Sequence, residues 1–363
     1  MKRRNLLIAV ILVWSVLAGI GCSLDGPTES GGAAAADSPG SEEVSAALPK
    51  TGQTVSYLVG DDGNLECGTA WPEPRFINHN DGTITDRLTG LMWERAPLDT
   101  VRAWTAAVDY CNSLELAGHS DWRLPNRTEL MSLFHFGVDQ PYSWLAGQGF
   151  GALSHEPYWS GTRCGEDPEQ AWTVSLTSYL GNVQRSDKGY ENHAMAVRTT
   201  SPGVIGLPRT GQDRTDKPGD DGSLQQGLDW PAPRFTDNGD GTITDELTGL
   251  MWQRSPVADK KTWENAIGYC NGLYLTGQFD WRLPNVLELA SLYNARRDDN
   301  HAWLNDQGFV GVQNEIYCSS TSLSADHDHQ EYAWMMNAGS GVVIPLKKID
   351  LNTWNVIAVR GGE

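Results

Sequence analysis

The chain contains one segment of about 150 residues twice. Residues 48–160 align without a gap on residues 207–319, at a constant offset of 159 positions. Beyond residue 160 the offset becomes 162, so the second copy carries three additional residues between positions 319 and 333. Two copies at a fixed spacing indicate two homologous units, and the Pro/Gly segment 201–206 separates them. The alignment therefore predicts domains at residues 48–200 and 207–363.

Charge excludes one class of partner. The 363 residues carry a formal net charge of −19, from 27 basic and 46 acidic side chains, and both copies are acidic. Nucleic-acid binding requires a basic stripe that neutralises phosphates, so we do not expect a nucleic-acid partner. The chain also has 15 Trp, most of which recur at equivalent positions in the two copies. That recurrence indicates a doubled aromatic core.

The first 47 residues resemble an export signal and a tether. Basic residues 2–4 precede the apolar segment Leu6–Ile20, which is too short to span a bilayer and is typical of a signal peptide over residues 1–21. Gly21 and Cys22 resemble a lipoprotein cleavage site, which predicts a lipid on Cys22; ordinary cleavage after Gly21 is the alternative. Residues 22–47 are small, polar and acidic, which is typical of a flexible tether. We therefore expect an exported bacterial outer membrane lipoprotein, periplasmic or surface-exposed, that contacts the membrane through its N-terminal lipid.

Each copy combines strand and helix patterns. An alternating TITD strand between Asn/Asp/Gly-rich turns predicts a β-hairpin meander. Apolar positions at helical spacing predict one helix from Trp104 and another from Trp263. Asn126 and Asn285, each followed three residues later by Glu, predict capping boxes that start a second helix. The last third of each copy is strand-like, so the fold class is α+β, with two helices and short antiparallel strands in each domain.

The ordered motifs PRF, TGLMW, YCN, DWRLPN and AVRGG resemble the Lcl_C domain family, the C-terminal module of the Legionella collagen-like protein. The family looks related to C-type-lectin-like folds, including the formylglycine-generating enzymes. The resemblance implies two tandem C-type-lectin-like domains in an exported bacterial protein. In the namesake it also implies adhesion to host glycosaminoglycans and self-association. Because both copies here are acidic, direct binding of that polyanion is not expected.

The DWRLPN segments hold charged residues with two interpretations. The arginine is either a clamp for a ligand carboxylate or a buried fork that ties a helix to a hairpin through bidentate bonds. We favour the structural interpretation, because folds with unrelated chemistry share the segment. The residues concerned are Asp121, Arg123 and Glu129 in the first copy and Asp280, Arg282 and Glu288 in the second.

Two groups of residues are weak candidates for metal binding. The acidic loops GDDG and DNGDG offer oxygen ligands for Ca²⁺, but turn chemistry explains them without metal. The additional loop of the second copy contains Asp326, His327, Asp328 and His329, which suit a transition metal. A solvated loop is the favoured interpretation, because the first copy has no His there. We therefore expect no cofactor, with Ca²⁺ as the alternative.

Six Cys in an exported chain favour disulfides. With Cys22 lipidated, the natural pairs within domains are Cys111 with Cys164 and Cys270 with Cys318, which leaves Cys67 single. Cys164 aligns five positions beyond Cys318, and an odd step along a strand reverses the face. The two bridges are therefore not equivalent.

The expected function is noncatalytic binding. Trp144 and Trp303 lie in loop-like segments, where they are candidates for stacking on a sugar; core packing is the alternative. The sequence contains no nucleophile elbow or phosphate loop, so we do not expect an enzyme. We expect an envelope-anchored binding or adhesion protein that recognises a glycan or an envelope partner. The alternatives are a structural envelope protein that makes protein contacts only, or an enzyme related to the formylglycine-generating folds.

Overall fold

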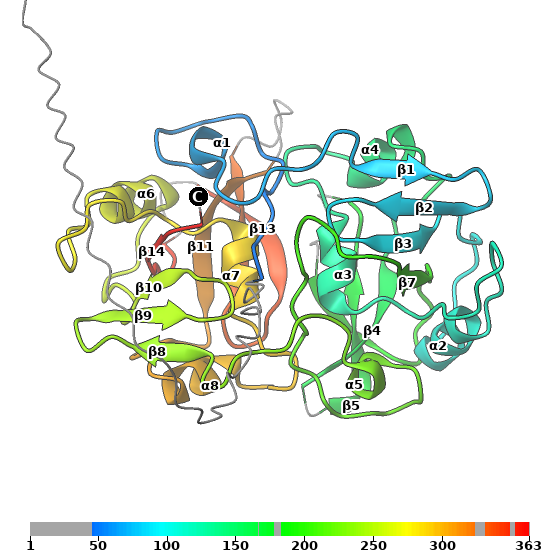
Figure 1. Cartoon of the computed structure of the whole chain (residues 1–363). Coiled ribbons are helices and arrows are strands. Elements are labelled where there is room, and N and C mark those ends of the chain that lie inside the picture. The colour runs from blue at the N-terminus through cyan, green and yellow to red at the C-terminus, as the bar shows by residue number, and fades with distance from the viewer. Residues whose placement is uncertain (1–45, 166, 178–182, 324–330, 349–352, 363) are drawn as a thin grey trace, which may run out of the picture. The chain divides into compact units, whose positions relative to one another are not determined.

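The computed structural model describes residues 46–165, 167–177, 183–323, 331–348 and 353–362, which belong to one unit (Figure 1). The same series of elements occurs twice. The first series is α1 (Asp62–Leu65), β1 (Phe76–Asn78), β2 (Thr83–Asp86), β3 (Leu91–Glu94), α2 (Trp104–Asn112), α3 (Arg127–Ser132), α4 (Pro141–Gly147), β4 (Tyr158–Cys164), β5 (Asp167–Val174), β6 (Val183–Asp187) and β7 (Val197–Thr199). The second is α5 (Asp221–Leu224), β8 (Phe235–Asp237), β9 (Thr242–Asp245), β10 (Met251–Gln253), α6 (Trp263–Asn271), α7 (Val286–Ser291), α8 (Asn300–Asp306), β11 (Ile316–Ser322), β12 (Tyr332–Asn337), β13 (Val343–Lys347) and β14 (Val359–Arg360).

The predicted meander forms a small antiparallel sheet in each copy, in the orders β1-β2-β3-β7 and β14-β10-β9-β8. Turn chemistry sets the register of the first hairpin, because Asp81 Oδ1 accepts bonds from both the backbone N–H and the hydroxyl of Thr83. Asp86 at the end of β2 accepts a bidentate bond from buried Arg75, with distances of 3.0 and 2.8 Å. The acidic turn residues therefore hold the hairpins together.

The helices partly match the expectation. The predicted amphipathic helix is α2, which buries Trp104, Ala107 and Cys111, and both predicted capping boxes are present. The expected number of two helices per copy is wrong, because each copy also has a short helix after the capping-box helix, α4 or α8, and a one-turn helix, α1 or α5. These helices have only four or seven residues, too short for apolar periodicity to reveal them.

One large sheet runs through both copies. Its six strands follow the order β11-β12-β13-β6-β5-β4, and all neighbours are antiparallel. The three-stranded parts meet where Val343 of β13 pairs with Val183 of β6. Each part thereby covers an edge that would be open in a separate domain. The main core cluster likewise contains residues of both copies, from Phe76 to Val359.

The segments before the two meanders are exchanged between the copies. We call residues 53–68 the first arm and residues 212–227 the second arm. Figure 1 shows α1 of the first arm over β11 of the second copy, and α5 of the second arm beside β4 of the first copy. In the first arm Gln53 Nε2 donates to the carbonyl of Ser322 at 3.0 Å, and in the second Arg163 Nη1 donates to Asp216 at 2.7 Å. The copies therefore complete each other.

Candidate functional site

The DWRLPN arginines form buried ion pairs. Both terminal nitrogens of Arg123 lie 2.6 Å from the carboxylate oxygens of Glu129, and those of Arg282 lie 2.7 and 2.6 Å from Glu288. All four side chains are almost fully buried. Each glutamate also accepts a bond from the backbone N–H of its helix N-cap. These arginines are fully engaged within the fold, as the structural interpretation expected.

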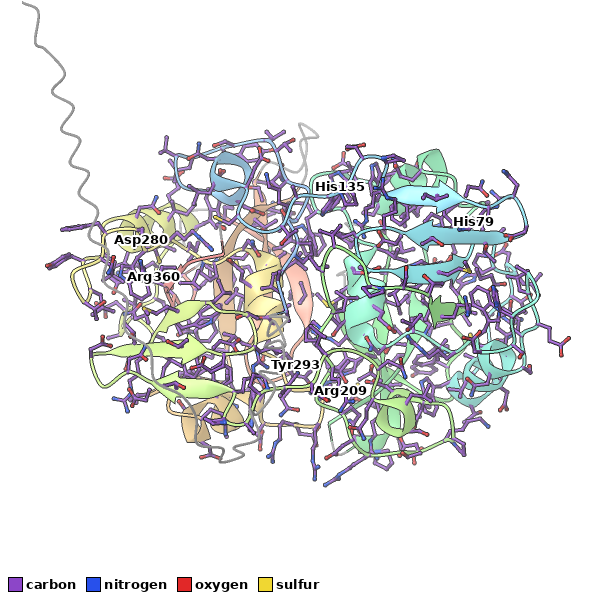
Figure 2. The ribbon with its side chains drawn as sticks, viewed as in Figure 1. His79, His135, Arg209, Asp280, Tyr293 and Arg360 are labelled. Atoms are coloured by element: carbon purple, nitrogen blue, oxygen red, sulfur yellow. The ribbon has the colours of Figure 1, made fainter. Side chains whose placement is uncertain are left out.

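The two aspartates of the same segments lie at the surface. Asp121 pairs bidentately with Arg198 of β7, at 2.7 and 3.0 Å, and Asp280 pairs with Arg360 of β14, at 2.8 and 2.9 Å. The hydrogen bond from each arginine holds the pKa of its aspartate below the usual value. Asp280 and Arg360 lie next to each other in Figure 2. Each pair ties the DWRLPN segment to the last strand of its sheet.

The GDDG loops belong to the arms. In the first GDDG loop Asp61 is the N-cap of α1, while Asp62 accepts bonds from the hydroxyls of Thr51 and Thr321, both at 2.7 Å. A Cβ on Gly63 would lie 2.1 Å from the carbonyl oxygen of Val55, so the loop requires glycine there. Within the described ranges, no three His, Cys, Asp or Glu side chains cluster as metal ligands. Asp326, His327, Asp328 and His329 lie outside those ranges, as does Cys22.

The proposed disulfides are not formed, which corrects that expectation. All the cysteines that the structure describes are thiols. Cys111 packs in the cluster around α2, whereas Cys164 belongs to the central core, so these two sulfurs are in different layers. Cys270 and Cys318 share one cluster as buried thiols. Burial raises the pKa of all four, and unreactive packing is therefore their role here.

The two stacking candidates pack inward. Trp303 is only 8% exposed and lies 5.7 Å from Trp230 and 5.8 Å from Phe235, measured between ring centroids. Trp144 is half-buried, 5.5 Å from Trp71 and 4.7 Å from His135. Trp303 in particular has no free face for a sugar, because helix α8 places its ring against Trp230 and Phe235. The core alternative describes this residue better.

A groove lies where the first arm meets the second copy. Its volume is about 560 Å³, and its floor includes Trp281, whose indole N–H donates to the carbonyl of Leu275. The arm supplies Val59 and Leu65, which are 80% and 42% exposed. The second copy supplies Phe279, 74% exposed, at the rim. A groove of this size accommodates a small organic ligand such as a disaccharide.

An exposed aromatic pair marks this groove. Tyr274 and Phe279 stack with their ring centroids 4.5 Å apart and an interplanar angle of 29°. Both belong to the tight turn before DWRLPN, closed by the bridge between Leu275 and Gln278. The first copy has Glu115 and Ser120 at the equivalent positions. The sequence analysis missed this pair; the signal was an aromatic pair present in one copy only.

The charges around the groove are balanced. Lys50 forms an ion pair with Glu66 at 3.0 Å, both on the arm side. On the opposite side Asp280 pairs with Arg360, and Arg282 is neutralised by buried Glu288. Each positive group therefore has its own carboxylate. The groove presents apolar and hydrogen-bonding surface with little net potential, in a chain that is strongly acidic overall.

The model of the Lcl C-terminal domain family matches residues 82–198 and 241–360. The chain belongs to this family. The Lcl C-terminal domain thus occurs twice, and the matched ranges hold the helices α2, α3 and α4 and their second-copy equivalents. Each arm lies before the matched range of its own copy, so the groove combines a family domain with a segment outside it. No curated protein matches the chain. In the part of the chain that the structure describes, no helix is sufficiently long and apolar to cross a membrane.

Proposed function

We propose that this protein is a noncatalytic binding or adhesion protein that holds a neutral glycan in the groove between the first arm and the second Lcl C-terminal domain. The exposed ring of Phe279, which lines the groove and stacks on Tyr274, carries the proposal. Large aromatic side chains gain stability when they are buried. Two stacked rings that are exposed to water therefore favour a role in ligand binding. The apolar face of a sugar ring suits Phe279.

The polar groups beside the rings support a glycan. The Asp280 carboxylate is held in place by Arg360, and an ordered carboxylate with free lone pairs accepts bonds from sugar hydroxyls. Lys50 and Glu66 offer a donor and an acceptor on the opposite side. Both groove carboxylates are paired with cations, which favours hydrogen bonding over proton transfer. The balanced charge favours a neutral ligand over a sulfated or carboxylated one.

The N-terminal features suggest where this binding takes place. We propose that Cys22 is lipidated and that residues 22–47 tether the Lcl C-terminal domains to the outer membrane. The basic and apolar start of the chain and the acidic, small-residue composition of the tether support this location. A tethered glycan-binding unit would attach the cell envelope to sugars on its own surface or on another surface.

A glycan array, with and without Ca²⁺, tests the function. We compare the wild-type protein with Phe279→Ser, which introduces the residue of the first copy. The control is Tyr190→Ser, which removes an aromatic ring that is 64% exposed but does not line the groove. We expect wild type and control to bind the same neutral glycan, and Phe279→Ser to bind at least about tenfold more weakly, about 1.4 kcal/mol.

Three results would contradict the proposal. If wild type binds no glycan in either condition, the protein-contact alternative is favoured, because exposed Val59, Leu65 and Phe279 would also suit an apolar segment of a partner. If Phe279→Ser binds the same glycan as strongly as wild type, the ligand lies elsewhere on the molecule. Binding that requires Ca²⁺ would point to a metal ligand set instead of the rings.

A further inference from the structure

The junction between the copies is built from two unlike halves. In one half Phe134 and Phe136, from the first copy, pack edge-on against Trp334 of β12 in the second copy, each with a centroid distance of 5.4 Å. These three rings are at most 2% exposed. This half is an ordinary apolar core contact, which hydrophobic burial stabilises.

The other half contains a cation. Its equivalent ring pair is Trp172 and Tyr293, 5.4 Å apart, and Ala295 stands where the first copy has a phenylalanine. The guanidinium carbon of Arg127 lies 4.8 Å from the Trp172 ring and 4.7 Å from the Tyr293 ring. At the position of Arg127 the second copy has Val286. The internal repeat therefore shows that this place in the fold is compatible with an apolar residue, and that the arginine is a specific feature of one copy.

Among the described residues, Arg127 has no negatively charged partner. The residue is 4% exposed, and its Nη2 donates to the carbonyl oxygen of Gly341 at 2.7 Å. Its buried Nε has no hydrogen-bond partner, and none of the described carboxylates forms an ion pair with the guanidinium. The guanidinium carbon of a second cation, Arg185, lies 5.4 Å from the centroid of the same tryptophan ring. A buried cation without a counter-ion is unfavourable, and two rings compensate only part of that cost.

A small cavity adjoins this arginine. It has a volume of about 60 Å³ and lies between α3 and α7, the capping-box helices of the two copies. Arg127, Arg209 and Arg234 all line it, and no Asp or Glu is among its described lining residues. Arg234 is neutralised by Asp245, while Arg209 pairs with exposed Asp229 through one terminal nitrogen and leaves its buried Nε without a partner. Figure 2 shows Arg209 beside Tyr293 at this junction.

We propose that this cavity binds a small monovalent anion of the halide class, held between the two copies by Arg127 and Arg209. A volume of about 60 Å³ admits a small monovalent ion together with water. The anion supplies the negative charge that the lining lacks and accepts N–H bonds from the two guanidinium groups. Because residues of both copies line the cavity, the bound anion strengthens their association. This site is separate from the glycan groove and does not depend on it.

Thermal unfolding in sodium bromide tests the anion site. Sodium gluconate keeps the ionic strength constant, because gluconate is too large for the cavity. We expect the Tm of the wild-type protein to rise with bromide and to reach a plateau, as binding to the folded state alone requires. Arg127→Val, which introduces the residue of the second copy, abolishes the rise. Arg87→Gln, which removes the same charge at an exposed position outside the cavity, keeps it.

A second variant and a direct observation make the test independent of the stability of Arg127→Val. Arg209→Gln changes a partly exposed residue, and we expect it to raise the bromide concentration at half-maximal effect at least fivefold. In crystals grown with bromide, an anomalous peak beside Arg127 would support the proposal. Equal bromide responses of wild type, Arg127→Val and Arg209→Gln would overturn it, as would the absence of the peak.

Discussion

Asp62 and Asp221 are buried carboxyls at the points where the arms dock. Asp62 accepts bonds from Thr51 of its own copy and Thr321 of the other, and it faces the ion pair of Arg282 with Glu288. Burial raises the pKa of Asp62 to about 7, against the lowering effect of the two hydroxyls. Asp221 repeats this arrangement in the first copy, with a pKa also raised to about 7. Two equivalent carboxyls therefore hold protons at a pH at which most aspartates have lost them.

The stability of the fold should decrease between about pH 4 and pH 7 because of these two residues. In that range the folded state retains a proton on each carboxyl that the unfolded state has released, so each contributes a fall of about 1.4 kcal/mol per pH unit. Their contribution is complete below pH 4 and is lost as the pH rises through about 7. Asp62→Asn keeps a neutral group that accepts both hydroxyl bonds, so it should reduce the fall by one such contribution.

Urea unfolding at pH 5, 6, 7 and 8 measures the effect. Asp221→Asn should reproduce the result of Asp62→Asn, and the double variant should show twice the flattening. Asp81→Asn, at an exposed turn residue whose pKa is lowered by the bond from Thr83, should not flatten the profile. A pH profile of Asp62→Asn parallel to that of wild type would contradict the buried, protonated state.

Helices α3 and α7 connect local sequence signals to the tertiary contacts of the arms. The capping-box side chain of Asn285 accepts the N–H of Glu288, and its Nδ2 donates to the carbonyl of Cys67 in the first arm, at 3.4 Å. Asn126 makes the equivalent bond to Gln226 in the second arm, at 3.2 Å. One residue thus starts a helix and binds the exchanged arm. Among the hydrogen bonds of the described residues, Thr262, the N-cap of α6, only caps its own helix, by accepting the N–H of Asn265.

Asn285→Ala should therefore destabilise the fold more than Thr262→Ala does. Loss of a cap costs about 1 kcal/mol, and Asn285→Ala also removes the bond to the arm. We expect about 1–2 kcal/mol for Asn285→Ala and less than about 1 kcal/mol for Thr262→Ala, measured by urea unfolding. A serine at this position can still cap the helix, but its side chain is too short to bond the carbonyl of Cys67. Asn285→Ser should therefore lose less stability than Asn285→Ala, but more than wild type. Equal costs for the two alanine variants would show that the arm bond contributes nothing.

The whole unit depends on mutual completion of the two copies. Both exchanged arms, the six-stranded sheet and the shared core cluster cross between them. Each copy alone would expose the edge of β6 or β13 and the surface that the other copy's arm covers. The chain should accordingly unfold as one cooperative unit, although its sequence predicts two domains.

A cut between the copies should leave them associated. We would insert a protease site after Ser201, which is exposed, and cleave the folded protein. The two fragments should elute together in size-exclusion chromatography and separate only in denaturant, because the arms and the β6–β13 pairing hold them. The uncut protein with the same insertion is the control. Fragments that separate without denaturant would show that the copies are independent domains joined by a linker.

The sequence by itself determined the repeat, the α+β class, the hairpin turns, the capping boxes and the buried arginine forks. Each of these depends on residues close together in the chain, so spacing and side-chain chemistry reveal it. Asn126 with Glu129 is an example, since both bonds of the capping box form within one turn of helix. The core role of most tryptophans followed in the same way, from their recurrence at equivalent positions.

Only the tertiary structure decided which copy each arm covers. Both copies contain the same arm and the same surface for it, so exchanged and unexchanged docking satisfy the same local pattern. The groove beside Phe279 is a consequence of that choice, because the first arm lines it. The cavity beside Arg127 is likewise lined by residues far apart in sequence. The failed pairing of Cys111 with Cys164 also became visible only in the tertiary structure: sequence order places them in one domain, and packing places them in different clusters.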